Sequence, residues 1–279
     1  IFCWQRALEL EPEYPLARQR IAEAYRAQGD RVKAKEYYLA AVRHDPGNTQ
    51  LLADLGDLLV EMNDLEGARA KFQHVLDLNP ESSRASMMLG LIASQNDRPD
   101  EALRHFQRVL DIDEGYPGLR AHLGETELRR GNHEQARYHL ELALEENPRD
   151  PVALMAMGNC LLETFHPAEA IPYYQRFLQF NPDAAGVHHN LAVCHFLLDQ
   201  FEPGIRHCLE ALQLEPDHVM VLHKLALAYM HLGRWNDARR TIDRGLMVQP
   251  DHAGLRRLRR RFWRMRLFGW LRRRARRAR

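Results

Sequence analysis

Residue types recur every 34 residues along almost the whole chain. The clearest recurring residue is a proline, which is missing from only one period, where Glu114 takes its place and Pro117 follows shortly after. Proline lacks a backbone N–H and clashes with the preceding turn, so each of these positions predicts the end of a helix. The prolines are Pro12, Pro46, Pro80, Pro148, Pro182, Pro216 and Pro250. A fixed period of this length predicts a stack of similar units rather than one globular domain.

Small residues follow the same period in two places. In the first half of each period, Gly or Ala comes directly after a large apolar residue, at Ala22, Gly56, Gly90, Gly124, Gly158, Ala192 and Ala226. In the second half, a small residue usually stands four positions before a large one, at Ala34, Ala68, Ala102, Ala136, Ala170, Gly204 and Ala238. Small residues opposite large ones let two helices interlock closely. Each period therefore predicts two antiparallel helices.

With these residues the sequence resembles the tetratricopeptide repeat family. The resemblance covers residues 1–252, as seven full units and a preceding half. It implies an all-α fold, a right-handed superhelical α-solenoid of antiparallel helix pairs, whose first helices line an inner face that binds partners. We expect residues 253–279 to form a capping helix, with Leu255, Leu258, Phe262 and Met265 in one apolar stripe, that runs into an Arg/Trp-rich basic tail. Pro172 falls one turn inside a predicted helix, where we expect a kink or a late helix start.

The inward positions that this resemblance implies form two groups. The acidic group contains Glu23, Asp54, Asp57 and Glu125. The second, mostly apolar group contains Met87, Leu91, Met155, Asn159, His189, Val193, Met220, His223 and Leu227. The pattern predicts an acidic end followed by a methionine-rich trough, which suits a peptide or amphipathic helix carrying basic and apolar residues. The alternative is that several of these side chains pack between adjacent first helices.

Two specialisations of the family are not supported by the sequence. Members that clamp a terminal carboxylate use Lys, Asn and other basic residues, but the corresponding positions hold Gln19, Glu23, Ala53, Asp57, Met87 and Leu91. Members with an asparagine ladder repeat Asn at one inward position, and here only Asn190 occupies it.

Reactive residues give little indication of catalysis. The densest histidine group is His188, His189, Cys194, His195, His207 and Cys208, but it lacks a compact zinc spacing such as HExxH or CxxC. We predict that these are ordinary core and surface residues, with no metal and no cofactor. The sequence also lacks GxGxxG, P-loop and GxSxG motifs, so we predict that this chain is not an enzyme. The four cysteines are widely spaced, which favours reduced thiols.

Charge is distributed very unevenly along the chain. Residues 256–279 hold 13 of the 39 basic residues and no acid, which leaves 26 basic against 38 acidic residues elsewhere. The candidate binding residues of this tail are Trp263, Arg264, Arg266, Trp270, Arg272, Arg273, Arg274, Arg276 and Arg277. Tryptophan among arginines is typical of a segment that lies on an anionic membrane surface. Nucleic acid is a less favoured partner, and binding to the acidic repeats or a solvated terminus are further alternatives.

The sequence thus predicts a non-catalytic interaction scaffold that is cytoplasmic, with peripheral attachment to a membrane through the tail as a further option. The first repeat is incomplete, so a second hypothesis is that the chain is the regulatory or substrate-recognition arm of a larger enzyme whose catalytic domain precedes residue 1. A third hypothesis is an adaptor that associates with nucleic acid through the tail. The sequence contains no run of eighteen apolar residues, so it does not predict a transmembrane helix.

Overall fold

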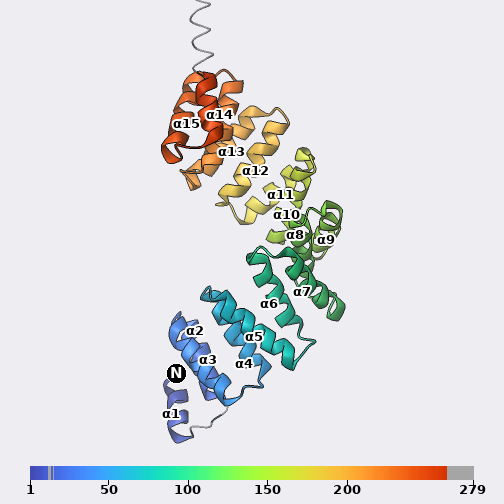
Figure 1. The fold of residues 1–279 in the computed structure, drawn as a ribbon, viewed down its shortest axis with the longest axis vertical. Coiled ribbons are helices and arrows are strands. Elements are labelled where there is room, and N and C mark those ends of the chain that lie inside the picture. The colour runs from blue at the N-terminus through green and yellow to red at the C-terminus, as the bar shows by residue number, and fades with distance from the viewer. Residues whose placement is uncertain (12–13, 15, 263–279) are drawn as a thin grey trace, which may run out of the picture. The chain divides into compact units, whose positions relative to one another are not determined.

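The structure, a computed structural model, describes residues 1–11, 14 and 16–262. Over these residues it contains helices and turns and no strand (Figure 1). The helices are α1 (Phe2–Leu10), α2 (Ala17–Ala27), α3 (Arg31–His44), α4 (Thr49–Glu61), α5 (Leu65–Leu78), α6 (Ser83–Gln95), α7 (Pro99–Ile112), α8 (Leu119–Arg129), α9 (His133–Glu146), α10 (Pro151–Glu163), α11 (Pro167–Phe180), α12 (Ala185–Leu197), α13 (Phe201–Leu214), α14 (Val219–His231) and α15 (Trp235–Val248). A further helix occupies residues 253–262.

The turn inside each helix pair has the same backbone geometry. One residue with positive φ ends every first helix from α2 to α14, and these residues stand 34 positions apart at Gly29, Asn63, Asp97, Gly131, Phe165, Asp199 and Gly233. Glycine, asparagine and aspartate tolerate this left-handed conformation, whereas Phe165 is an unusual occupant. Asp30 and Asp64 then cap α3 and α5, accepting hydrogen bonds from the backbone N–H groups of Lys33 and Gly67. Turn chemistry therefore repeats in register with the prolines.

Glycines on the first helices admit large side chains from the second helices. A Cβ added to Gly90 would lie 2.4 Å from the ring of Phe106, and one added to Gly56 would lie 2.7 Å from the ring of Phe72. Both rings are fully buried. A methyl group has no room at these contacts, so the glycines set how closely the paired helices approach. The predicted antiparallel helix pairs are confirmed.

The repeat that consists of α12 and α13 reverses this arrangement. Here the ring belongs to the first helix, because a Cβ on Gly204 of α13 would lie 2.3 Å from the ring of Phe196 of α12. Cys208 stands where other second helices carry a large residue, and it is buried with Ala192 in one apolar cluster. In this repeat the large residue of the contact has therefore moved from the second helix to the first, while the small residue keeps its position on the second helix.

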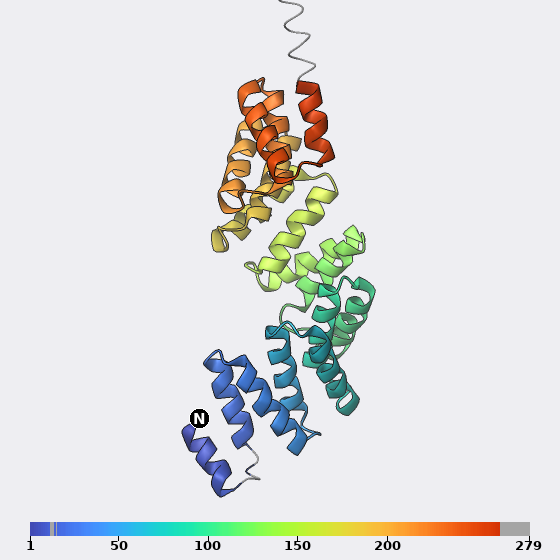
Figure 2. The same cartoon turned by 60° about the vertical axis from the view of Figure 1, so that its left-hand side comes forward.

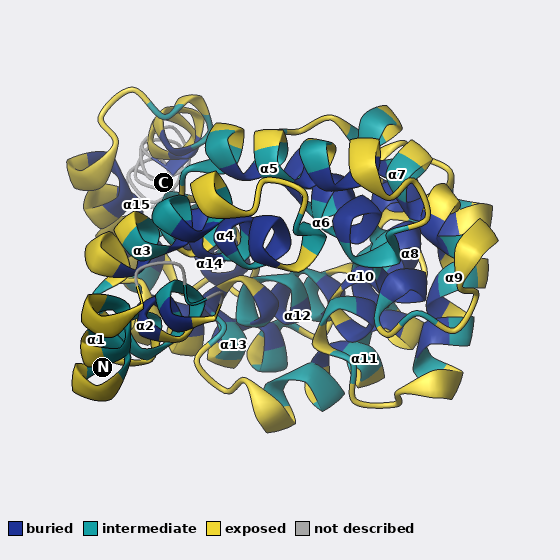
Figure 3. Ribbon diagram, turned by 90° about the horizontal axis from the view of Figure 1, so that it is seen from below, coloured by how far each residue is buried: buried dark blue, intermediate teal, exposed yellow. Residues whose placement is uncertain are grey.

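The chain divides into two compact units, Ile1–Ala143 and Leu144–Arg279, and the boundary falls within α9. In the first unit, α6 contacts α8, and in the second unit α12 contacts both α10 and α14, so first helices of successive repeats are neighbours. Figure 2 shows the helix pairs from a second direction, and Figure 3 shows buried residues on the sides of helices that face other helices. Each unit thus has a core that continues from repeat to repeat.

The helix at residues 253–262 packs on the last pair. Leu255, Leu258 and Phe262 are all buried, and Leu255 closes over Gly245 of α15. Met265, predicted for the same stripe, lies outside the described residues. The expectation of a late helix start at Pro172 is wrong, because α11 begins at Pro167 and continues through Pro172.

Candidate functional site

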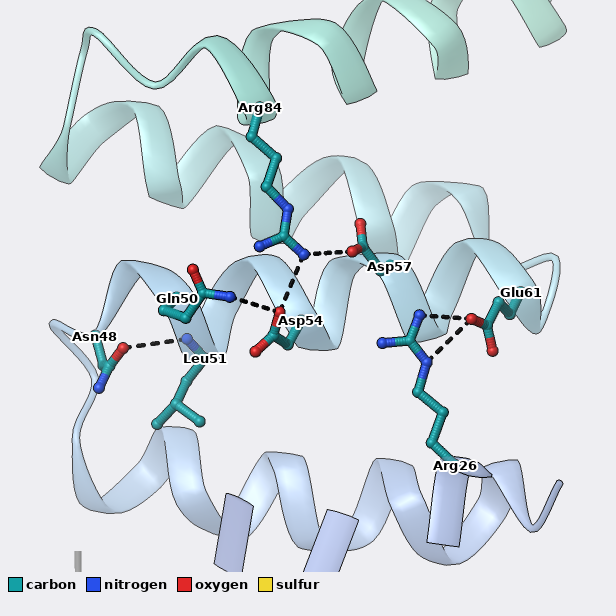
Figure 4. Close-up of polar contacts among 8 residues, drawn as sticks. All are labelled: Arg26, Asn48, Gln50, Leu51, Asp54, Asp57, Glu61 and Arg84. Carbon is teal, nitrogen blue, oxygen red and sulfur yellow. Dashed lines mark hydrogen bonds and ion pairs between the residues drawn. The ribbon is translucent and has the colours of Figure 1, made fainter. Parts of the chain in front are cut away.

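The predicted acidic end lies in the first unit, where its carboxylates are already paired. Arg84 of α6 donates hydrogen bonds to Asp57 and Asp54 of α4, the latter at 3.0 Å, and the two carboxylate side chains are only 23% and 14% exposed (Figure 4). Burial alone would lower the pKa of the Arg84 guanidinium, but these hydrogen bonds raise it above its ordinary value. Arg84 therefore stays charged and neutralises part of the acidic group.

The other acidic residues have partners as well. Arg20 pairs with Glu23 at 2.9 Å on α2, and Arg129 pairs with Glu125 at 2.8 Å on α8. A hydrogen bond from His122 and the charge of Arg129 lower the pKa of Glu125 despite its partial burial. Figure 4 also shows Arg26 of α2 reaching Glu61 of α4. The predicted acidic end therefore carries arginines as well, which come from neighbouring turns and helices.

Met87, which was predicted to line the groove, is buried in the core. Its side chain is 6% exposed and belongs to the core cluster around α6, α7 and α8, against which Leu91 also packs. Met87 therefore cannot contact a partner without a change in the core, and Leu91 is only partly accessible. The alternative interpretation, packing between helices, holds for Met87.

The second unit places three predicted apolar residues on its surface. Met155 of α10 is 37% exposed, Met220 of α14 is 47% exposed, and Leu227 of α14 is 37% exposed. Met155 and Met220 both line a hollow of about 450 Å³, together with His189 of α12. Leu227 lines a second hollow of about 320 Å³. The first helices of this unit thus bring together apolar side chains from repeats that are far apart in sequence.

Asn190, which lines the first hollow, belongs to a polar network with the buried Tyr174 and with Asn159. The Tyr174 hydroxyl donates to Asn159 Oδ1 at 2.7 Å, and Asn190 Nδ2 donates to the same oxygen at 3.0 Å. Burial, helped by the nearby His218, lowers the pKa of His189 to about 4, so this imidazole is neutral near pH 7. The lining of the hollow therefore combines two methionines, a neutral histidine and one amide of a polar network.

Val193 and His223 are half-buried, and neither lines the first hollow. His223 instead lies beside His252, with ring centroids 5.4 Å apart. The inward positions of the first helices failed to indicate Phe177, because it belongs to the second helix α11, and His218, because it precedes α14 as its N-terminal cap. The caps of neighbouring repeats could have suggested His218, whereas no pattern in the sequence indicated Phe177.

Some residues of the predicted histidine group meet on the other side of α12. His188 of α12, His207 and Glu210 of α13 place one nitrogen or oxygen atom each within 4.8 Å of the others. Cys194 and Cys208 are buried, and burial raises the pKa of these thiols to about 11 and about 12, so both stay protonated. Glu210, which the sequence analysis did not include, replaces the cysteines in this cluster.

Neither the basic tail nor a membrane-spanning helix belongs to the described part of the structure. The tail residues Trp263, Arg264, Arg266, Trp270, Arg272, Arg273, Arg274, Arg276 and Arg277 lie beyond the described residues. Over the residues that the structure does describe, none of the helices combines the length and the apolar character needed to cross a bilayer.

Helix pairs that stack through a continuous core and leave an apolar hollow on their first helices are typical of solenoid repeat proteins. Comparison with protein families specifies the class further. Three profiles described as tetratricopeptide repeat match residues 16–48, 53–117, and 93–160 with 204–262. Together they span most of the chain, which therefore belongs to the tetratricopeptide repeat family.

Among curated proteins, the chain is similar to the type IV pilus assembly protein PilF of Pseudomonas aeruginosa. The two are 24% identical over 175 residues, which is 61% of this chain and 68% of PilF. It is also 25% identical over 171 residues to the protein O-mannosyl-transferase TMTC1 of Homo sapiens, but that match covers 59% of this chain and only 19% of the relative. The chain thus spans a small part of this longer relative.

Solved structures show the same fold. The structure of the APC/C hetero-tetramer Cut9-Hcn1 matches with a TM-score of 0.70 and 19% identity, over 93% of this chain and 51% of that one. Pseudomonas aeruginosa PilF matches with a TM-score of 0.67 and 16% identity, over 76% and 97% of the two chains. YrrB, described as a tetratricopeptide repeat protein with an unusual peptide-binding site, matches with a TM-score of 0.54 and 22% identity, over 67% and 96%. Membership of this family indicates a scaffold for protein–protein interaction, and the solved structures show that the fold is shared.

Proposed function

We propose that the chain is a non-catalytic scaffold that binds a peptide or helix of another protein in the hollow between Met155 and Met220. The observation that carries this proposal is the exposure of both methionines beside the neutral His189. Methionine is flexible and polarisable, so it adapts to different apolar side chains. The partner segment therefore carries apolar anchors, such as leucine, methionine or phenylalanine, at helical or extended spacing.

The paired carboxylates of the first unit change the expected chemistry of the partner. A partner arginine gains little here, because Arg84 already neutralises the mostly buried Asp54 and Asp57, and even exposed ion pairs contribute only about 0–1 kcal/mol. Binding should therefore depend mainly on apolar contact and only weakly on salt concentration. The peptide-binding site named for YrrB and the assembly role named for PilF support a role of this kind.

The test is selection of peptides from a random display library on the full chain, followed by fluorescence anisotropy of the strongest binder. The variant Met155→Glu/Met220→Glu places two charges in the hollow. Burial of the exposed half of each methionine contributes about 1 kcal/mol, so we expect a loss of about tenfold or more. Met247→Glu is the matched control, since Met247 is 83% exposed on α15 and lines neither of the two hollows.

The proposal predicts enriched apolar anchors, full binding by the control and strongly reduced binding by the double variant. Equal binding by the double variant and the wild type would remove the hollow as the binding site. Selected peptides that are purely charged, with affinities that fall steeply with added salt, would also contradict the proposal.

Membrane attachment, association with nucleic acid and a role as the arm of a larger enzyme can each be tested separately. Membrane attachment through residues 256–279 predicts flotation with anionic but not with neutral vesicles, and loss of flotation on deletion of that segment. Association with nucleic acid predicts DNA retention by the same segment with a steep salt dependence. A regulatory arm of a larger enzyme predicts catalytic sequence upstream of residue 1.

A further inference from the structure

Three potential metal ligands form a small triangle between α12 and α13. The His188 and His207 Nδ1 atoms are 3.2 Å apart, and Glu210 Oε2 lies 3.0 Å from the first and 2.9 Å from the second. Tetrahedral zinc with bonds of about 2.0–2.1 Å separates its ligand atoms by about 3.3 Å. The three edges are close to one face of such a tetrahedron.

The hydrogen bond on the far side of His188 orients its ring for such a role. His188 Nε2 lies 3.2 Å from the carbonyl oxygen of Pro182. A carbonyl oxygen only accepts, so the Nε2–H group donates and the neutral ring presents the lone pair of Nδ1 to His207 and Glu210. Metal-binding histidines commonly donate their second N–H to a backbone carbonyl in this way.

Proton counting also favours a cation at the centre of the triangle. With a neutral His188 bonded to Pro182, the only N–H that can point into the triangle belongs to His207. It can satisfy His188 or Glu210, and in either case the lone pairs of His188 Nδ1 and Glu210 Oε2 face each other at 3.0 Å. A divalent cation would satisfy all three atoms at once. The competing arrangement is a doubly protonated His188 that donates to both Pro182 and Glu210.

The triangle is confined to one repeat. Leu154 and Leu222, at the positions equivalent to His188, are fully buried core residues. At the position of Glu210, the flanking repeats carry Arg176 and Arg244, which donate to the carbonyl oxygens of Pro148 and Pro216. A histidine in place of a core leucine weakens the packing of the repeat, and so does a glutamate in place of an arginine. Both are explained if the two side chains bind the same ion.

We propose that His188, His207 and Glu210 bind one divalent transition metal ion of the zinc class. The spacing of His207 and Glu210 puts both on one face of α13, and His188 completes the site from α12. Two imidazoles and one carboxylate suit zinc and leave a fourth coordination position for water or for a donor atom from a partner. Glu210 is 49% exposed, so the ion can enter from solvent on that side.

The experiment uses the full chain without a polyhistidine tag, treated with chelator and then dialysed. Zn²⁺ binding is measured by competition with a chromophoric chelator, and Co²⁺ is added separately to record its visible absorption. We expect one ion per chain and an absorption typical of four-coordinate cobalt. Binding should weaken at lower pH, because protons compete for the histidine nitrogens.

Two variants test the assignment, and a third is the control. Glu210→Gln and His207→Gln should each weaken Zn²⁺ binding by at least about tenfold, because even the outer partners of metal ligands contribute about 10- to 100-fold. His189→Gln should bind normally, since His189 is the next residue of α12 but lies beside His218, with ring centroids 5.4 Å apart. Circular dichroism of each metal-free variant checks folding, and the exposed Glu210 makes its variant the safer one.

Failure of the wild-type chain to bind Zn²⁺ or Co²⁺ in competition with the chelator would overturn the proposal and support the ion pair of a protonated His188 with Glu210. Binding that is equally strong in the wild type, Glu210→Gln and His207→Gln would also overturn it, because the ion would then lie elsewhere. Neither result depends on the peptide-binding hollow, which lies on a different set of residues.

Discussion

Replacement of Gly158 by alanine tests whether the glycines of the first helices set the helix spacing. A Cβ at this position would lie 2.6, 2.8 and 2.9 Å from three atoms of the Tyr174 ring. The ring is fully buried, and its hydroxyl group bonds to Asn159 and Asn190. The ring therefore cannot move away without loss of these hydrogen bonds.

The magnitude follows from two opposing effects. Overpacking a close-packed core costs about 1–3 kcal/mol, and disturbed hydrogen bonds at the Tyr174 hydroxyl cost about 1 kcal/mol each. Alanine in place of glycine stabilises a helix interior by about 1 kcal/mol. We expect Gly158→Ala to destabilise the second unit by about 1–2 kcal/mol.

The matched control is Gly186→Ala in the first turn of α12. A Cβ there would meet no atom within 4 Å, so only the helix propensity should act and stability should rise by a few tenths of a kcal/mol. Urea denaturation followed by circular dichroism gives the two midpoints, and hydrogen exchange of α10 and α11 shows where protection is lost. A Gly158→Ala midpoint at or above that of the wild type would refute the argument that this contact is tight.

Three further predictions concern Phe165, His189 and the cysteines. Phe165→Gly should raise stability by up to about 1 kcal/mol, measured as a higher thermal midpoint, because Phe165 has a φ of 62° and is 82% exposed. Because the folded-state pKa of His189 is about 4 and the unfolded value is about 6.5, the unfolded chain binds more protons between these values. Stability should therefore fall as pH drops from about 6.5 to 4, and His189→Gln should reduce this loss by at most about 3 kcal/mol, as measured by urea denaturation at several pH values. In the folded chain at pH 8, a thiol reagent should modify exposed Cys3 quickly and Cys194 and Cys208 slowly; rapid labelling of all three would contradict their burial.

The fold was largely predictable because its determinants are local and repeated. Prolines, small residues and large apolar residues each specify a helix end or a helix contact, and several periods in register remove the ambiguity that one period would leave. The contact between Gly204 and Phe196 was not predicted, because the small residue kept its position while its partner moved to the other helix. Such a change shows only when both sides of a contact are known.

The candidate site was less predictable, since it depends on side chains from different repeats. The repeat register predicted Met155, His189 and Met220 for one groove, and in the structure the three residues line one hollow. The partners of Asp54 and Asp57 were missed because Arg84 stands about 30 positions away, in the first turn of the next first helix. The grouping of Glu210 with two histidines was not predicted, because glutamates are common on exposed helix faces and the spacing of His207 and Glu210 is not a compact zinc motif.

The contact between Phe196 of α12 and Gly204 of α13 limits how this molecule can be rearranged. Deletion or duplication of a whole helix pair keeps Phe196 together with Gly204, so shuffling of complete pairs preserves this contact. Replacing α13 with the second helix of another repeat sets the methyl group of an alanine against the Phe196 ring. Moving α13 alone into another repeat separates Gly204 from Phe196. In this repeat, the two helices can therefore be moved together, whereas one helix of the pair cannot be exchanged freely.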